Sequence, residues 1–209
     1  MKVGVLAFQG DVLEHMRVLQ ALEVEPKEVR SLSDFLAVQG LIIPGGESTV
    51  ISQFLDETGL HQKIMERSEK EQFPIYGTCA GAILLAKEVL SDGALEKRVH
   101  PLDLMDTTIE RNAYGRQTES FEDTVMLEIE GKSLSSKAVF IRAPQVKRTG
   151  PTVRVLAEHR GYPVLLLQGS LLASTFHQEL TGGISVVHQF FLSIIRLRDE
   201  DTRNPSTRP

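Results

Sequence analysis

The chain contains one cysteine, Cys79, with a glycine two positions before it, Gly77, and another two positions after it, Gly81. A short apolar run that suits a buried strand precedes this corner, and an apolar run that suits a helix follows it. A nucleophile between two such glycines is typical of the nucleophile elbow of hydrolases. Unpaired N–H groups and the helix dipole at a helix start favour the reactive thiolate. We interpret Cys79 as a nucleophile, the alternative being a buried structural cysteine.

A base and an orienting group for this thiol stand far downstream, at His177 and Glu179. A nucleophilic cysteine needs a base, and the base needs a partner that fixes its tautomer. Residues two apart in an extended segment point to the same side, so the Glu179 carboxylate could orient the His177 imidazole. The pair means little by itself. Together with the elbow it predicts a Cys-His-Glu triad.

A glycine-rich segment, Pro-Gly-Gly-Glu-Ser-Thr at 44–49, follows a strand-like run and precedes a helical pattern. Ligands bind at such positions in open α/β sheets, and consecutive glycines let backbone N–H groups approach an anion. In acyl transfer the segment would supply oxyanion donors opposite the Cys79 N–H. The alternative is an ordinary turn with Ser48 as the helix N-cap. A phosphate-binding P-loop is disfavoured, because the Gly-Lys-Ser/Thr ending is missing.

Two further polar segments, at 110–117 and 141–144, contain arginine. The planar guanidinium suits bidentate recognition of a carboxylate. A surface salt bridge is the simpler interpretation of each arginine.

Composition limits the class of protein. Of the 209 residues 41% are hydrophobic and 24% charged, and the formal net charge is −5, as in ordinary soluble globular proteins. An acidic chain without a basic cluster argues against a nucleic-acid partner. One cysteine cannot form an intramolecular disulfide, and no Cys/His set suits structural zinc. With no signal peptide and no bilayer-length apolar stretch, we expect a cytoplasmic protein without a membrane partner.

Strand-like and helical patterns alternate through the first half of the chain, which predicts a mostly parallel sheet with helices on both faces. From about Asp103 strand-like runs dominate, at 107–110, 124–129, 138–141, 153–157, 164–168 and 171–176, before a final apolar helix. We expect an α/β, flavodoxin-like three-layer sandwich with a mostly parallel central sheet and additional antiparallel strands in the C-terminal half. We expect a single domain at 1–197 and a charged, proline-bearing, disordered tail at 198–209.

The motifs together resemble a known family. They are 44–49, Gly-Thr-Cys-Ala-Gly at 77–81, Arg-Asn-Ala-Tyr-Gly-Arg-Gln at 111–117, Ile-Arg-Ala-Pro at 141–144 and His-Gln-Glu at 177–179. In this order they closely resemble the glutaminase subunits of pyridoxal 5′-phosphate synthase, which are class I glutamine amidotransferases. The elbow and His-x-Glu are general to class I, whereas the other motifs, with Phe8-Gln9-Gly10 and Glu14-His15, are specific to this subfamily. The resemblance runs from Lys2 to about Leu197.

This resemblance implies hydrolysis of L-glutamine to glutamate and ammonia. Cys79 would be the nucleophile, His177 the general base and acid, and Glu179 its orienting partner. Gly46 and the Cys79 N–H would lie near the oxyanion. The residues implied to line the glutamine site are Gly46, Glu47, Ser48, Arg111, Ile141 and Arg142.

The resemblance also implies a partner, a (β/α)8-barrel synthase subunit in a hetero-oligomer. That subunit combines the ammonia with a pentose phosphate and a triose phosphate to make pyridoxal 5′-phosphate, vitamin B6. Ammonia would pass through the protein interior, Gln9 would lie at the interface, and activity would depend on docking. We expect neither a cofactor nor a metal.

Two positions depart from the pattern of the family. Asp11, a plausible N-cap of the first helix, stands where a small residue is expected, which could alter the interface. Gly182 and Gly183 replace a more polar entry to the last helix.

Other classes compete with this interpretation. The glutaminase subunit of another class I amidotransferase, such as the one feeding imidazole glycerol phosphate synthesis, is the nearest alternative. A cysteine peptidase would not need segment 111–117, and a DJ-1-like cysteine hydrolase usually lacks the late His-x-Glu. A binding-only protein with a vestigial site is disfavoured, because every triad position is filled.

Overall fold

The computed structural model describes residues 1–111, 113, 120–183 and 185–203. Its main sheet has the strand order β11-β12-β13-β4-β3-β1-β2. Five neighbouring strands run parallel, namely β2 (Glu25–Val29), β1 (Lys2–Leu6), β3 (Gly40–Ile43), β4 (Ile75–Thr78) and β13 (Leu171–Ser174). Antiparallel β12 (Tyr162–Gln168) and β11 (Arg154–His159) extend the sheet beyond β13. The expected mostly parallel α/β sheet with antiparallel additions is confirmed.

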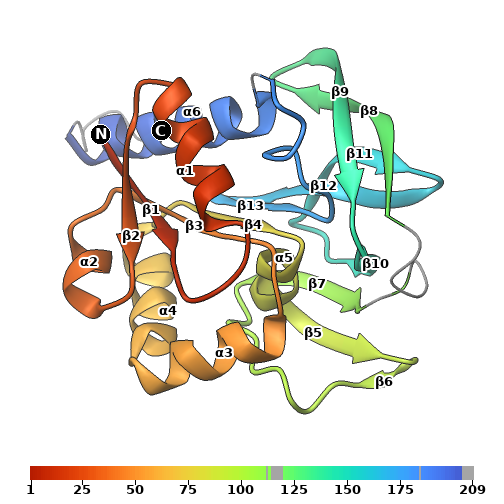
Figure 1. The fold of residues 1–209 in the computed structure, drawn as a ribbon, viewed down its shortest axis with the longest axis horizontal. Coiled ribbons are helices and arrows are strands. Elements are labelled where there is room, and N and C mark those ends of the chain that lie inside the picture. The colour runs from red at the N-terminus through yellow and green to blue at the C-terminus, as the bar shows by residue number, and fades with distance from the viewer. Residues whose placement is uncertain (112, 114–119, 184, 204–209) are drawn as a thin grey trace.

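Helices cover both faces of this sheet (Figure 1). On one face lie α1 (Val12–Ala21) and α6 (Val186–Arg203). On the other lie α3 (Ser48–Glu57), α4 (Leu60–Glu71) and α5 (Ala80–Leu85), with the short α2 (Leu32–Leu36) beside β2. Strand β3 supplies both layers, since Leu41 and Ile43 pack on the α3–α5 side and Ile42 on the α1–α6 side. This alternation is what the two-residue period of a strand requires.

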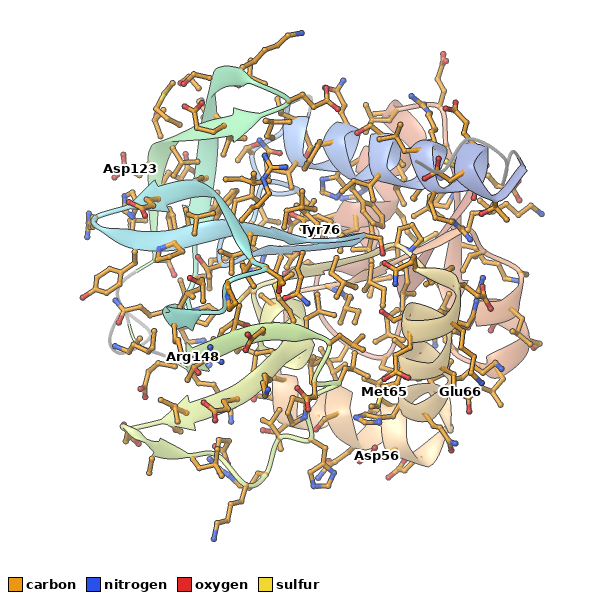
Figure 2. All side chains as sticks on the ribbon, turned by 180° about the vertical axis from the view of Figure 1, so that it is seen from behind. Asp56, Met65, Glu66, Tyr76, Asp123 and Arg148 are labelled. Carbon is orange, nitrogen blue, oxygen red and sulfur yellow. The ribbon has the colours of Figure 1, made fainter. Side chains whose placement is uncertain are left out.

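Tyr76 of β4 lies at the centre of the core between the main sheet and the helices α1 and α6. Figure 2 shows its side chain in the middle of the molecule, between the sheet and α6. It is fully buried, its ring contacts those of Phe191 and His188 in α6, and its hydroxyl hydrogen-bonds with Ser174 Oγ. Burial raises the pKa of Tyr76 above its ordinary value, so the phenol stays neutral.

Two smaller sheets complete the fold. One has the order β10-β7-β5-β6, from β10 (Gln145–Thr149), β7 (Met105–Glu110), β5 (Ala86–Ser91) and β6 (Ala94–Leu95). The other is the hairpin of β8 (Phe121–Ile129) and β9 (Lys132–Phe140). Within the described residues, no helix combines the length and the apolar character needed to cross a membrane.

Several boundaries differ from expectation. The sequence analysis missed α2, β5, β6 and β10, which are short or carry exposed polar residues. The strand predicted to end at Phe176 ends at Ser174. The prediction of a disordered tail from Arg198 is wrong for Arg198–Arg203, because these residues belong to α6. Residues 204–209 lie outside the described part of the chain. Arg198 anchors this end, because its guanidinium donates to the Gln39 carbonyl at 2.8 Å and lies over the Phe73 ring.

Candidate active site

The corner between β4 and α5 has the geometry of a nucleophile elbow. Cys79 adopts φ 50° and ψ −98°, a region that non-glycine residues rarely enter. Both flanking glycines are required by close backbone contacts. A Cβ on Gly77 would lie 2.5 Å from the Gly81 carbonyl, and one on Gly81 would lie 2.0 Å from the Ile43 oxygen. The strained elbow expected from the sequence is confirmed.

One expected role of Cys79 is wrong. Its N–H donates to the Ser174 carbonyl at 2.8 Å, because the parallel pairing of β13 with β4 continues one residue beyond the strand. This N–H therefore cannot also point at an oxyanion. The next residue, Ala80, begins α5, and the first N–H groups of a helix have no intrahelical acceptor. Ala80 is thus the backbone donor that the elbow geometry offers.

His177 and Glu179 follow β13, the strand that pairs with β4. His177 Nδ1 and Glu179 Oε1 are 2.7 Å apart, and both side chains are buried. Backbone bonds tie His177 to Val139 of β9 in both directions, at 2.8 and 3.2 Å. The imidazole also interacts with the Cys79 side chain, and this interaction helps to raise the pKa of His177. Since Nδ1 faces the carboxylate, Nε2 is the atom left to exchange a proton with sulfur, which is the arrangement of a nucleophile, a base and an orienting group.

The protonation of His177 reflects a balance of opposing effects. Burial lowers its pKa, but hydrogen bonds to Asp11, Cys79 and Glu179 overcome that cost and hold the pKa well above the usual value. The imidazolium form of His177 is therefore favoured.

A pocket of about 190 Å³ opens over Cys79 and His177. All predicted substrate residues line it, although they come from three remote segments. Glu179 lies behind His177, and the Gln9 side chain closes one wall by accepting a 2.6 Å hydrogen bond from the Glu47 N–H. The lining residues are Gln9, Gly10, Asp11, Gly46, Glu47, Ser48, Cys79, Ile83, Arg111, Ile141, Arg142 and His177.

The Arg111 side chain is paired with acidic side chains of the protein itself. Its guanidinium donates to Glu47 Oε1 at 2.7 Å and to Glu96 Oε2 at 2.9 Å. It therefore fixes the Glu47 carboxylate at the pocket. Ser48 begins α3 rather than capping it, since Glu47 occupies the N-cap position. Of the motif at 111–117, residues 112 and 114–119 lie outside the described part of the chain, as does residue 184 in the entry to α6.

The sequence analysis missed a buried polar chain behind Glu179. His15 Nε2 of α1 lies 3.4 Å from Glu179 Oε1, and His15 Nδ1 lies 2.8 Å from His188 Nε2 of α6. The chain of contacts extends to Ser185, whose Oγ lies 2.5 Å from His188 Nδ1. A signal was present, because each histidine lies on the apolar stripe of its helix: His15 is four residues before the buried Leu19, and His188 is three before Phe191. A polar residue on such a stripe needs a buried partner.

Asp11 was also missed as a site residue. It occupies the N-cap position of α1 but makes no side-chain capping bond; its Oδ2 instead lies 3.2 Å from His177 Nδ1. Asp11, His177 and Glu179 thus each place a nitrogen or oxygen atom that could bind a metal ion within 4.8 Å of the others. We interpret the group as sharing one proton, because an Nδ1 that donates to a carboxylate has no lone pair for a metal.

The two buried histidines make stability depend on pH. Burial lowers the pKa of His15 well below its usual value and that of His188 to about 3, with the neighbouring His188 contributing to the shift of His15. In the unfolded chain both titrate near pH 6.5. Below that pH the unfolded chain binds more protons than the folded one, so stability falls as pH falls. The raised pKa of His177 adds stability below pH 6.5 and loses it as pH rises through its folded value, so it does not offset this slope.

We therefore expect the free energy of unfolding to fall between pH 6.5 and 5 by up to about 1.4 kcal/mol per pH unit for each histidine. Urea denaturation at a series of pH values measures this slope. His188→Gln should reduce this slope by up to about 1.4 kcal/mol per pH unit, the contribution of one proton. Equal slopes for wild type and His188→Gln would contradict the assignment.

Comparison with known proteins agrees with this geometry. Residues 5–197 match the SNO glutamine amidotransferase family. The chain belongs to this family. It is 47% identical over 192 residues to the pyridoxal 5′-phosphate synthase subunit PdxT of Mycolicibacterium vanbaalenii, covering 92% of this chain and 96% of that one. For the protein of the same name from Thermus thermophilus the identity is 46%, with the same coverage.

Solved structures extend the comparison. A crystal structure described as a glutamine amidotransferase aligns with a TM-score of 0.84 at 45% identity, covering 93% of this chain and 98% of the other. PurLQS from Thermotoga maritima aligns with a TM-score of 0.64 at 15% identity, over 92% of this chain and 97% of that chain, which shows a shared fold alone. Membership of the amidotransferase family disfavours the peptidase and DJ-1-like alternatives.

Proposed function

We propose that this protein is the glutaminase subunit of a pyridoxal 5′-phosphate synthase. The observation that carries the proposal is the convergence of Cys79 and His177 on one pocket, with Glu179 behind His177, in a glutamine amidotransferase whose relatives named PdxT match over more than 90% of the chain. The substrate is L-glutamine. The products are glutamate and ammonia.

The chemistry is a two-step acyl transfer. The Cys79 thiolate attacks the side-chain carbonyl carbon of glutamine, and the N–H groups of Ala80 and Gly46 stabilise the oxyanion. His177 gives its Nε2 proton to the departing amine, which leaves as ammonia with a γ-glutamyl thioester on sulfur. Water then attacks the thioester, His177 takes its proton, and thiolate and glutamate are released. Glu179 keeps the imidazole oriented throughout.

The other pocket residues bind glutamine. Glu47 and Ser48 lie where α3 begins, and Ile141 and Arg142 form the wall provided by the segment after β9. Arg142 at the rim suits the α-carboxylate of an amino acid, and the Glu47 carboxylate, held by Arg111, suits its α-ammonium group.

The partner is a (β/α)8-barrel synthase subunit that receives the ammonia through the protein interior. It uses the ammonia with a pentose phosphate and a triose phosphate to build pyridoxal 5′-phosphate. Docking at the loop of Gln9, which hydrogen-bonds the glycine loop through Glu47 N, would position Gly46 and so activate the site. A free catalytic thiol needs a reducing compartment, so we place the complex in the cytoplasm.

We expect the subunit alone to release little ammonia from glutamine, and the rate to rise by about 10²-fold or more when a barrel subunit is added, the range associated with one oxyanion donor. Glutamate and ammonia are measured together, with Cys79→Ala as the blank. Full activity without a partner would move the assignment to another amidase. Absence of activity in both conditions would overturn it.

A further inference from the structure

The Nδ1 atom of His177 faces two carboxylates. Glu179 Oε1 lies 2.7 Å away on the buried side, and Asp11 Oδ2 lies 3.2 Å away on the pocket side. The Glu179 side chain is fully buried, whereas that of Asp11 is 32% exposed. One N–H is thus shared between an enclosed acceptor and a partly hydrated one.

The backbone around Asp11 is built to hold this contact. The Asp11 N–H donates to the Gly45 carbonyl at 3.3 Å, which joins the start of α1 to the glycine loop. A Cβ on Gly45 would lie 2.3 Å from His177 Cε1 and 2.9 Å from Asp11 Oδ2, so only glycine leaves room for the carboxylate and the ring together. A Cβ on Gly10 would lie 1.7 Å from the Gly45 oxygen. These contacts tie Asp11, Gly45 and His177 into one unit.

The charges around His177 indicate what the second carboxylate, that of Asp11, contributes. Desolvation opposes a buried imidazolium, and the groups that favour it are Asp11, Cys79 and Glu179. His15 behind Glu179 is held neutral by burial, so it adds no positive charge. Of the described residues that line the pocket, Arg142 and Arg111 are the cations, and Arg111 is paired with Glu47 and Glu96. Asp11 therefore places a negative charge directly against the ring on its open side.

We propose that Asp11 is a positioning residue of the glutaminase site, a second carboxylate that holds His177 toward Cys79 and stabilises its protonated form. The inference rests on the proposed function for its meaning in catalysis. The geometry that carries it can be tested without glutamine.

The pH dependence has a definite sign. A carboxylate that favours imidazolium raises the pKa of His177, which extends the charged form of this ring to higher pH. Removing the charge of Asp11 lowers that pKa. The alkaline limb of kcat/KM must then move to lower pH.

The single cysteine allows a direct test. Iodoacetamide alkylation of Cys79, followed by intact mass across pH 5–10, reports the thiolate–imidazolium pair without substrate or partner. Wild type, Asp11→Asn and Asp11→Glu are compared with Glu14→Gln, which removes one charge from the same helix at a side chain paired with Arg17. We expect Asp11→Asn to move the upper transition down by about one pH unit, a tenfold change in the proton equilibrium. In Asp11→Glu the transition should lie closer to its wild-type pH than in Asp11→Asn, and Glu14→Gln should give the wild-type profile.

Kinetics with the barrel subunit separate positioning from substrate binding. We expect Asp11→Asn to lower kcat by about tenfold above neutral pH, with KM within about twofold of wild type. An alkylation profile of Asp11→Asn that superimposes on that of Glu14→Gln would overturn the proposal. So would a rise in KM at unchanged kcat. A shifted profile in a chain that does not hydrolyse glutamine would uphold the proposal for the thiol pair and count against the proposed function.

Discussion

Replacement of Cys79 by serine is expected to lower glutaminase activity in the complex by more than about 10³-fold, because the reactive sulfur is lost while the elbow stays intact. Serine is close to cysteine in size, and its hydroxyl would meet the same imidazole. A hydroxyl is far harder to deprotonate than a thiol, so His177 cannot hold it as an anion in the ground state. The measurement is steady-state release of glutamate with the barrel subunit present.

A matched pair of histidine variants supplies the control. His177→Gln should be as inactive as Cys79→Ser, and the double variant should be little worse, because residues that act as a unit are not additive. His61→Gln should keep full activity, since that ring hydrogen-bonds with the Pro101 carbonyl and is not among the described residues that line the pocket. Retention of more than a tenth of the activity by Cys79→Ser would contradict the covalent mechanism.

Gly81→Ala is expected to destabilise the protein by more than about 4 kcal/mol, the range reached only by severe core defects. The added methyl group would lie 2.0 Å from the Ile43 carbonyl oxygen and 2.9 Å from its carbon, which are backbone atoms that no rotamer change can move. Relief requires α5 to separate from β3. Urea denaturation or, if the chain does not accumulate, the yield of folded protein measures the effect.

Gly183→Ala is the matched control, because a Cβ there meets no atom of the described residues beyond its chain neighbours within 4 Å. It should change stability by no more than about 0.5 kcal/mol. Ile43 directly precedes the glycine loop, so any Gly81→Ala protein that folds should also lose activity through displacement of Gly46. A stable and fully active Gly81→Ala protein would show that α5 and β3 are not locked together as described.

The sequence was sufficient to predict elements whose pattern is local. Buried parallel strands such as β1, β3 and β4 are continuous apolar runs, and the elbow at Cys79 is defined by its own neighbours. The strand β10 could not be found this way, because its Lys147 and Arg148 are exposed and pairing with β7 alone makes it a strand. Arg198–Arg203 looked like a tail for a similar reason: the contacts that order this segment come from Gln39 and Phe73.

The site shows the same division. Motifs and resemblance identify residue types without coordinates, so the triad and most of the residues that line the pocket could be named from the sequence, whereas Gly10, Asp11 and Ile83 were not. The hydrogen-bond partner of the Cys79 N–H was predicted wrongly, since it depends on the register Ser174↔Thr78. Asp11 was predicted as a cap, and its contact with His177 depends on how closely α1 approaches the glycine loop. Distances between remote segments are set by the packed fold, and no local spacing encodes them.

The placement of β13 between β4 and β12 determines when reactivity can arise during synthesis. Ribosomes deliver the N-terminal part first, so the elbow and its thiol are made well before the segment with His177 and Glu179. Until that late strand inserts into the sheet, the thiol lacks both base and orienting carboxylate. Such non-local pairing is a slow step of folding. A truncated or half-folded chain is therefore catalytically inactive, and ammonia release is restricted to molecules that have completed their central sheet.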